Sequence, residues 1–259
     1  MFFGKTVHLS PARMILIGFA LLILVGTGLL MLPISTNSPG GATFLDALFT
    51  ATSATCVTGL VVHDTALYWT PFGQAVILIL IQIGGMGVVT VAIAIAMLSG
   101  KKIGLRQRWV MQESIAAPQV GGIVRLTGFV LKMVLLLESI GAILLALRFC
   151  PEVGLLRGIW YGVFHSISAF CNAGFDLFGV RSPFSSLTGY TGDPVVNLVV
   201  MLLIITGGLG FLTWHDIKTH KWHLHAYRLQ SKLILAATMV LLLLPGLFLF
   251  FYEFSKPQW

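Results

Sequence analysis

Charged residues are scarce in this sequence. Asp, Glu, Lys and Arg together make up 10% of the 259 residues, while hydrophobic residues make up 57%. A soluble domain of ordinary composition carries about 25% charged residues. The mean hydropathy of +0.94 therefore excludes an ordinary soluble domain, and it excludes a disordered chain as well.

Cysteine is also scarce. The three residues Cys56, Cys150 and Cys171 have no metal-type spacing, and an odd number gives no disulfide framework. Acidic residues number nine against sixteen basic ones, so the net charge is +7. The sequence therefore has to be interpreted through its apolar runs and the placement of its basic residues.

Five apolar runs are long enough to cross a bilayer, which takes about 20 residues. They span residues 12–34, 73–99, 126–149, 194–214 and 230–252. The sequence therefore predicts an all-α polytopic membrane protein. The first run is longer than a signal-peptide core and has no small-residue cleavage site, so we expect it to be retained.

The basic residues predict an orientation. Twelve of the sixteen lie in segments 1–13, 100–132 and 215–232, and none lies in 33–75. Positively charged loops stay in the cytoplasm. We therefore expect a multi-pass protein of the cell membrane with a cytoplasmic N-terminus, an extracytoplasmic C-terminus, and 33–75 outside. The positive charge is a topology signal, so membrane lipids are the expected surroundings and no nucleic-acid partner is needed.

The stretch TSATCVTGLVV (52–62) lies between the first two runs. As a helix, the piece before it (42–54) would be about 20 Å long, too short for a hydrocarbon layer of about 30 Å. A half-length helix that enters the membrane and returns through an extended loop is one interpretation. An amphipathic helix on the outer surface is the alternative. The apolar positions that we expect this helix to bury are Phe44, Leu45, Leu48 and Phe49.

The pattern occurs twice. With a shift of 115 residues, LFTATSATCVTGL (48–60) aligns with VFHSISAFCNAGF (163–175). With a shift of 123, IQIGGMGVVT (81–90) aligns with IITGGLGFLT (204–213). The difference falls in an outer loop, around 181–193, where insertions are tolerated. The chain thus repeats a unit of helix, half-helix, loop and helix with parallel topology, which favours the re-entrant interpretation.

Such a loop offers backbone carbonyls. A half-helix that enters from the outside directs the negative end of its dipole toward the membrane centre. Glycine at the end of the loop permits backbone angles that other residues resist. Rings of carbonyl oxygens can replace the hydration shell of potassium, so VTG (57–59) and NAG (172–174) need no charged side chain to coordinate a cation.

The motifs TSATCVTGL and SAFCNAGFDL resemble the selectivity-filter segments of the Trk/Ktr/HKT potassium transporters, and the linker GLRQRWVMQESIAAPQVGGIVRL (104–126) does too. The resemblance covers essentially the whole chain and is strongest to the bacterial Ktr-type membrane subunit. It implies four membrane-pore-membrane units, potassium as the transported ion, and a cytoplasmic nucleotide-binding regulatory ring. It also implies a homodimer of the full-length form, and sodium is a candidate coupling ion. By motif position, the filter residues are Thr55, Cys56, Val57, Thr58, Gly59, Phe170, Cys171, Asn172, Ala173 and Gly174.

The sequence departs from that pattern, because only two complete units fit. We predict a first repeat over 1–103, a cytoplasmic linker over 104–123 and a second repeat over 124–218. Residues 219–259 would hold the first helix of an incomplete third repeat. The chain would then supply two of four filter segments, and we expect it to behave as a fragment that does not conduct alone. A non-conducting membrane scaffold is the alternative.

Several other residues have two interpretations. The paired glycines are either hinges or, as we favour, sites of close helix packing. Glu138, in the middle of a run, is either a buried structural carboxyl, charged or protonated, which we favour, or part of an ion pathway. Asp176 either attracts cations at the outer mouth or caps a turn. The glycines are Gly84, Gly85, Gly87, Gly207, Gly208 and Gly210.

A histidine-rich segment, WHDIKTHKWHLHAY (214–227), suggests a different class, a metal-dependent membrane enzyme. Its candidate ligands are His215, His220, His223 and His225, with the single carboxylate Asp216. Such enzymes need several clusters from separate loops, so we favour a basic loop that flanks a span or docks the regulatory ring. We therefore expect no enzymatic activity and no metal other than potassium at the filter.

Overall fold

The computed structural model describes residues 10–88, 90–92, 95, 104–115 and 122–254, and this part of the chain is helical apart from loops and one isolated β-bridge, Thr36–Trp69. Contacts divide it into two compact units, up to Gly207 and from Gly208 onward. The α-helices are α1 (Pro11–Leu30), α2 (Phe44–Thr55), α3 (Thr65–Tyr68), α4 (Pro71–Met86), α6 (Leu105–Ile115), α7 (Ile123–Val153), α8 (Leu155–Phe170), α9 (Pro194–Gly208), α10 (Phe211–His220) and α11 (Leu229–Phe254). Short 3-10 helices are η1 (Pro33–Ser35), η2 (Phe178–Val180), η3 (Thr188–Tyr190) and η4 (Leu224–Ala226).

Long apolar helices confirm the predicted fold class. Within the described residues, α1, α7 and α11 are each long and apolar enough to cross a membrane, and α9 with α10 forms one further candidate as a broken span. The chain is an all-α polytopic membrane protein. Several of these helices expose large apolar side chains, as expected of surfaces that face lipid.

Two of the predicted runs are interrupted rather than continuous. In 73–99, α4 ends at Met86 and Gly87 adopts φ +82°. In 194–214, α9 ends at Gly208 and Gly210 adopts φ +78°. Glycine ends helices in this way because the left-handed region costs it nothing. Residues 89, 93–94 and 96–99 of the first run lie outside the described residues, as do 116–121 of the predicted linker.

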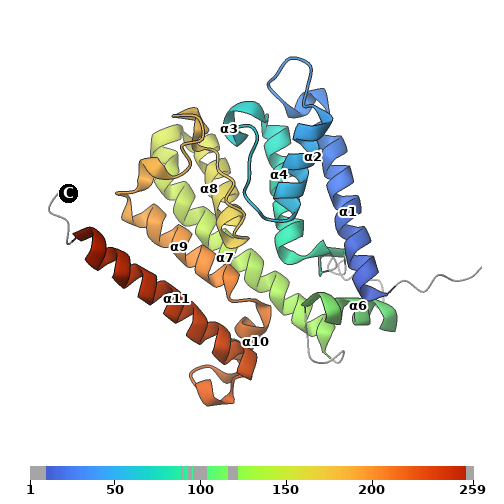
Figure 1. Ribbon diagram of the computed structural model, residues 1–259, viewed down its shortest axis with the longest axis vertical. Helices are drawn as coiled ribbons and strands as arrows, with labels where there is room; N and C mark the ends of the chain where they lie inside the picture. The colour runs from blue at the N-terminus through green and yellow to red at the C-terminus, as the bar shows by residue number, and fades with distance from the viewer. Residues whose placement is uncertain (1–9, 89, 93–94, 96–103, 116–121, 255–259) are drawn as a thin grey trace, which may run out of the picture. The chain divides into compact units, whose positions relative to one another are not determined.

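Helix α2 packs against both α1 and α4, as Figure 1 shows for the blue and teal helices. It does not bury the face that the sequence pattern indicated, because Phe44 and Leu45 are exposed. The buried face is small, with Ala47, Ala51 and Ala54 fully enclosed. Small residues let membrane helices approach closely while large apolar side chains face outward. Packing between two long helices is the behaviour expected of a re-entrant half-helix.

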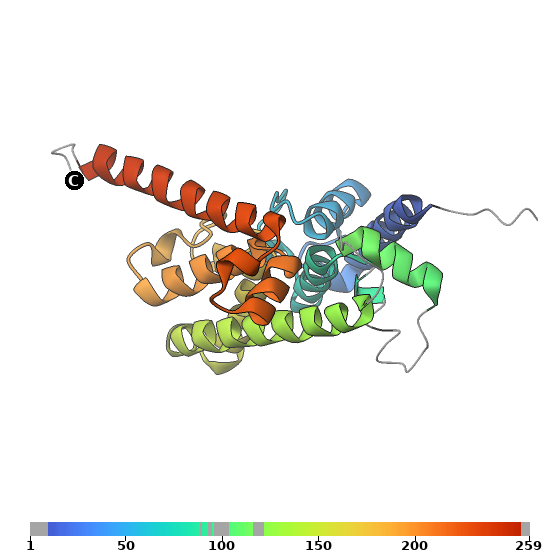
Figure 2. The ribbon, with the colours of Figure 1, turned by 90° about the horizontal axis from the view of Figure 1, so that it is seen from below.

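In the second repeat, α7 and α8 form a tight hairpin. Gly154 joins them with φ +86°, and its N–H donates to Cys150 O at 3.0 Å. A Cβ on Gly162 would lie 2.6 Å from Ala142 O, so the two helices touch through backbone. Figure 2 shows α7 along its length and passing α4, whereas α1 and α4 are seen closer to end-on.

Candidate filter loops

The loops that follow α2 and α8 have the same backbone conformation. Val57 and Asn172 both lie in the left-handed region, with φ +57° and +59°. Two residues later, Gly59 and Gly174 both adopt φ +74°. Left-handed angles are uncommon for residues other than glycine, so finding the same two departures at equivalent positions shows that the sequence repeat is also a structural repeat.

One serine in each half-helix holds its loop. Ser53 Oγ donates to Leu60 O at 2.7 Å, and Ser168 Oγ donates to Phe175 O at 2.6 Å. The serines thereby fix the far end of each loop, one residue beyond its glycine. The backbone bonds repeat too: Cys56 N to Thr52 O with Cys171 N to Ile167 O, and Thr58 N to Ser53 O with Ala173 N to Ser168 O.

The last residue of each half-helix packs its carbonyl oxygen against a glycine of a later helix. For α2 this glycine lies on α4, and for α8 it lies on α9. A Cβ on Gly84 would lie 2.0 Å from Thr55 O, and a Cβ on Gly207 would lie 1.8 Å from Phe170 O. Neither distance is possible for a side chain, so both positions require glycine. The favoured interpretation of these two glycines, close packing, is confirmed. We call Gly84 and Gly207 the seat glycines.

The two loops also meet each other. A Cβ on Gly59 would lie 2.5 Å from Ala173 O and 3.4 Å from the Cα of Gly174. Ala173 is buried at this contact. The structure therefore brings together the glycine end of the first loop and the glycine end of the second, which are 115 residues apart in the sequence.

His165 was not predicted from the sequence, although it is central to the second loop. Leu177 N–H donates to His165 Nε2 at 3.2 Å, so Nδ1 carries the proton and donates to Tyr161 O at 2.7 Å. Its ring stacks on Phe178 with centroids 4.5 Å apart. A neutral, buried histidine thus ties the exit of the loop to α8. The only sequence signal was its place one turn before the repeated motif.

Asp176, directly after the second loop, makes a capping contact. Its Oδ1 accepts a hydrogen bond from Phe178 N–H at 2.9 Å. Burial raises the pKa of this carboxyl, the Phe178 N–H lowers it, and the charge of Asp64 raises it further. The contact is the one expected from the turn-capping interpretation.

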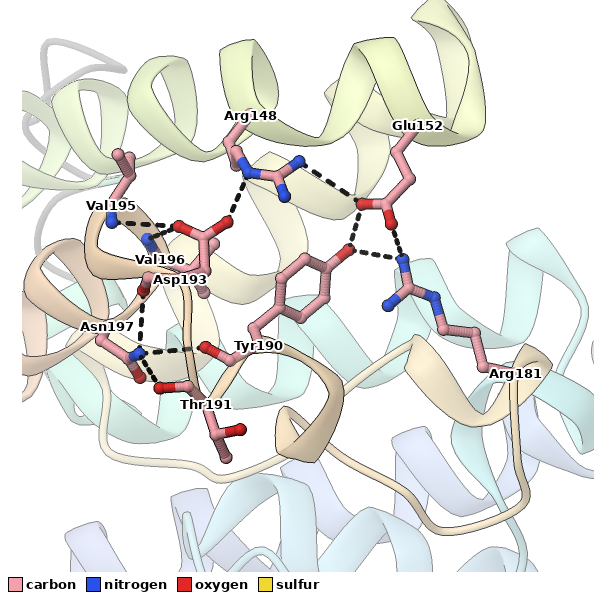
Figure 3. Close-up of polar contacts among 9 residues, drawn as sticks. All are labelled: Arg148, Glu152, Arg181, Tyr190, Thr191, Asp193, Val195, Val196 and Asn197. Carbon is pink, nitrogen blue, oxygen red and sulfur yellow. Dashed lines mark hydrogen bonds and ion pairs between the residues drawn. The ribbon is translucent and has the colours of Figure 1, made fainter.

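Beyond the second loop, five side chains form a cluster that Figure 3 displays together with its neighbours. We call it the α7–α9 polar cluster, and its members are Arg148, Glu152, Arg181, Tyr190 and Asp193. Glu152 joins its parts, since it accepts from Tyr190 Oη at 2.8 Å and pairs with Arg148 at 3.5 Å and with Arg181. Arg148 Nε also donates to Asp193. Burial, followed by the hydrogen bond to Glu152, raises the pKa of Tyr190 to about 12.

Asp193 is also the N-cap of α9. Its Oδ1 accepts from the N–H groups of Val195 and Val196 at 3.0 and 3.1 Å. These bonds, together with Arg148, lower the pKa of the Asp193 carboxyl. Asn197 Nδ2 donates to Tyr190 O at 3.0 Å, so the start of α9 and the preceding loop form one hydrogen-bonded unit (Figure 3). From the sequence we expected only a longer loop around 181–193 in the second repeat, and these contacts were not predicted.

The histidine-rich segment does not assemble a metal site among the described residues, where no group of three or more His, Cys, Asp or Glu side chains is placed to hold an ion. Its carboxylate, Asp216, is buried and used within its own unit. Asp216 Oδ2 accepts from Ser231 Oγ at 2.7 Å and from Arg228 N–H at 3.1 Å. These bonds tie α10 to the start of α11.

Glu138 is buried, as the favoured interpretation required, with 5% of its surface exposed. It lies in the middle of α7 and accepts a hydrogen bond from Gln82 Nε2 of α4 at 3.1 Å. Lys132, on the same helix, is exposed. The two repeats therefore share a buried polar contact in addition to the meeting of their loops.

Comparisons with known proteins agree with this architecture. A family model described as TrkH, cation transport protein, matches residues 12–255. The chain is 44% identical over 253 residues to Ktr system potassium uptake protein B of Bacillus subtilis, covering 98% of this chain and 55% of that protein. It is 42% identical over 243 residues to potassium/sodium uptake protein NtpJ of Enterococcus hirae, covering 94% of this chain and 52% of that protein. Ktr system potassium uptake protein B of Vibrio alginolyticus is 37% identical over 248 residues, covering 95% and 53%. The chain thus spans about half the length of these curated relatives.

Proposed function

The chain belongs to the TrkH family of cation transport proteins, and we propose that it takes part in potassium uptake across the cell membrane. In this proposal it supplies two segments of a backbone-carbonyl selectivity filter, Thr55 to Gly59 and Phe170 to Gly174. The observation that carries the proposal is the repeated loop. Two different sequences adopt the same left-handed angles, are held by equivalent serines and meet at their glycine ends.

The arrangement suits cation coordination because backbone carbonyls are available where the half-helices end. The carboxyl ends of α2 and α8 carry partial negative charge, which favours a cation nearby. Ser53 and Ser168 hold the loops in one conformation, so the carbonyls do not have to reorganise when an ion enters. Each seat glycine lets its helix support a loop from behind. Carbonyl dipoles in a fixed ring are how potassium is bound without its water.

Two segments make half of such a ring. The named potassium-uptake relatives are about twice as long as this chain, so we propose that the working transporter has four segments. We further propose that the full-length form is a homodimer that binds a cytoplasmic nucleotide-binding ring. The second relative's name includes sodium, which supports sodium as the candidate coupling ion. The proposed orientation keeps the N-terminus in the cytoplasm and the loops open to the outside.

The test is a chimera in which this chain is followed by the remaining part of the Bacillus subtilis relative, expressed in cells that lack potassium uptake. Gly59→Ser and Gly174→Ser should abolish uptake or admit sodium, because a Cβ disturbs the carbonyl ring. Gly28→Ser is the matched control, since a Cβ there meets nothing within 4 Å. Potassium uptake is measured with and without competing sodium. If both filter variants kept full potassium selectivity, the filter assignment would be wrong.

The 259-residue chain alone, expressed in the same cells, should not restore growth at low potassium. Restored growth, together with a crosslinked dimer of the short chain, would show that two copies complete the ring.

A further inference from the structure

The buried contact between Glu138 and Gln82 joins the two repeats. Glu138 belongs to α7 of the second repeat, and Gln82 to α4 of the first. Gln82 Nε2 donates to Glu138 Oε2 at 3.1 Å. Ser166 of α8 does not serve this carboxyl, because its hydroxyl donates to the main-chain oxygen of Glu138 at 2.7 Å. Among the described residues, the Glu138 side chain thus has one hydrogen bond, and it comes from the other repeat.

Two oxygen atoms of this contact have no hydrogen-bond partner. Within the described part of the chain, Oε1 of Glu138 and Oε1 of Gln82 are both shielded from solvent and both unpaired. Buried polar atoms almost always find a partner. Both of these atoms are acceptors when Glu138 is ionised, so neither can satisfy the other. The unpaired atoms are the second oxygens of two side chains that are already bonded to each other.

No basic side chain among the described residues neutralises Glu138. Lys132 of α7 is exposed, and a separation of six residues places it about 120° around the helix from Glu138. From the second loop, a titratable neighbour is the Cys171 thiol, which a Cβ on Gly85 of α4 would approach to 2.6 Å. A thiol brings no positive charge. An unpaired carboxylate in the middle of a membrane helix is costly, so the neutral acid is the favoured form.

We propose that Glu138 carries a proton on Oε1 and shares it with Oε1 of Gln82, forming a proton-binding site between the two repeats. One proton then satisfies both unpaired atoms. The acid donates its O–H to the amide oxygen while the amide donates its N–H to the acid carbonyl, and the two side chains form a cyclic pair with two hydrogen bonds. Loss of this proton would set a carboxylate against the amide oxygen and weaken the contact between α4 and α7.

The site lies beside the filter loops. Gln82 precedes the seat glycine Gly84 by two residues on α4, and Cys171 belongs to the second loop. Loss of the proton would therefore loosen the helix that supports the first loop. With Glu138 ionised, the contact keeps a single hydrogen bond, so the folded chain should be less stable than with Glu138 protonated.

Infrared spectroscopy of the purified chain in lipid bilayers tests the site directly, since a protonated carboxyl has its own carbonyl stretch. At neutral pH the unaltered chain should show this band, and Glu138→Gln should lose it. Glu138→Gln should also remove the part of the pH dependence of stability that comes from Glu138, because an amide keeps both hydrogen bonds and does not ionise. Glu113→Gln is the control: Glu113 is exposed on α6, so its loss should leave the band unchanged.

Gln82→Leu is a second variant that tests the proton site independently if Glu138→Gln does not fold. It removes both hydrogen bonds but keeps the acid, so the band should move to higher frequency and persist to higher pH. The proposal is wrong if the unaltered chain and Glu138→Gln have the same spectrum. It is also wrong if replacing choline by sodium at constant pH removes the band, because a metal cation would then be the resident ligand.

Discussion

The loops after α2 and α8 reach one conformation from different sequences. TCVTG (55–59) and FCNAG (170–174) share only the cysteine and the glycine, yet their left-handed residues differ by two degrees at the first position and agree at the glycine. What they also share lies outside the five residues: a serine two positions before each stretch and a seat glycine beneath it. The loop is therefore set by its attachments, and its own side chains are of secondary importance.

The segments around the two loops differ in kind. In the first repeat, neutral hydrogen bonds join residues 34–37 to residues 67–70. Thr70 Oγ1 donates to Ile34 O at 2.6 Å, and Asn37 Nδ2 donates to Leu67 O at 2.9 Å. In the second repeat, the α7–α9 polar cluster joins α7 to residues 181–193 with ion pairs (Figure 3). The first repeat also holds the His63–Asp46 pair at 3.3 Å. The second repeat has three ion pairs among its cluster side chains, so its surroundings should respond more strongly to acid and salt.

The largest effect should come from the seat glycines. Gly84→Ala and Gly207→Ala place a Cβ on a carbonyl oxygen that cannot move without moving the loop. Each should destabilise the chain by about 1–3 kcal/mol or more. Thermal unfolding in detergent measures the loss. Gly28→Ala is the control and should be neutral or slightly stabilising, because its Cβ meets nothing within 4 Å. Equal behaviour of all three variants would contradict the seat assignment.

The loop glycines Gly59 and Gly174 should differ in how much stability is lost when each is replaced. Gly59→Ala and Gly174→Ala both force alanine into the left-handed region, at a cost of about 1–2 kcal/mol. Gly59→Ala should cost more, since its Cβ also meets Ala173 O at 2.5 Å, whereas a Cβ on Gly174 has Gly59 Cα as its nearest atom at 3.7 Å. The same unfolding measurement gives the order. A larger loss at Gly174 would show that the two loops do not meet as described.

Replacing Ser53 and Ser168 should have effects that differ less from each other than those of the two glycines. Ser168→Ala leaves Phe175 O without its donor, at a cost of about 1–2 kcal/mol. Ser53→Ala removes the donor to Leu60 O and also an acceptor of Thr58 Oγ1 at 2.9 Å. Ser53→Ala should therefore be the more harmful of the two. Hydrogen exchange of the loop amides tests this order, with faster exchange expected after residue 59 than after residue 174. Ser38→Ala, far from both loops, should change neither.

Lowering the pH should destabilise the segment after the second loop more than the segment before the first loop. This is the smallest of the expected effects. The pKa of Asp193 is lowered in the folded chain, so its stabilisation is present above the unfolded pKa and is lost as pH falls through the folded value. Between neutral pH and about pH 3, protection against exchange, taken relative to the intrinsic amide rate at each pH, should fall over 188–197 and change little over 33–37. Asp193→Asn should remove most of the acid dependence over 188–197. An equal response of both segments would contradict the contrast between them.

The sequence predicted the shared loop well because its determinants are local. A serine, a helix end and a glycine recur at fixed spacing, so alignment alone placed Gly59 on Gly174 and Gly84 on Gly207. The buried face of α2 was predicted wrongly, because in a membrane the large apolar residues face outward and alanines mediate the packing. His165 and the α7–α9 polar cluster were not found, because each depends on partners that are brought near only by folding. The pairing of Glu138 with Gln82, 56 residues apart, was out of reach for the same reason.

The left-handed Val57 and Asn172 have an evolutionary consequence. A duplicated gene must keep the residues that fasten a copied loop, but here those residues are few and lie mostly outside the copied stretch. A valine in one copy and an asparagine in the other hold the same angle. The side chains along each loop are then free to diverge while the backbone stays fixed. Duplication can thus produce two loops with the same backbone conformation and different side chains.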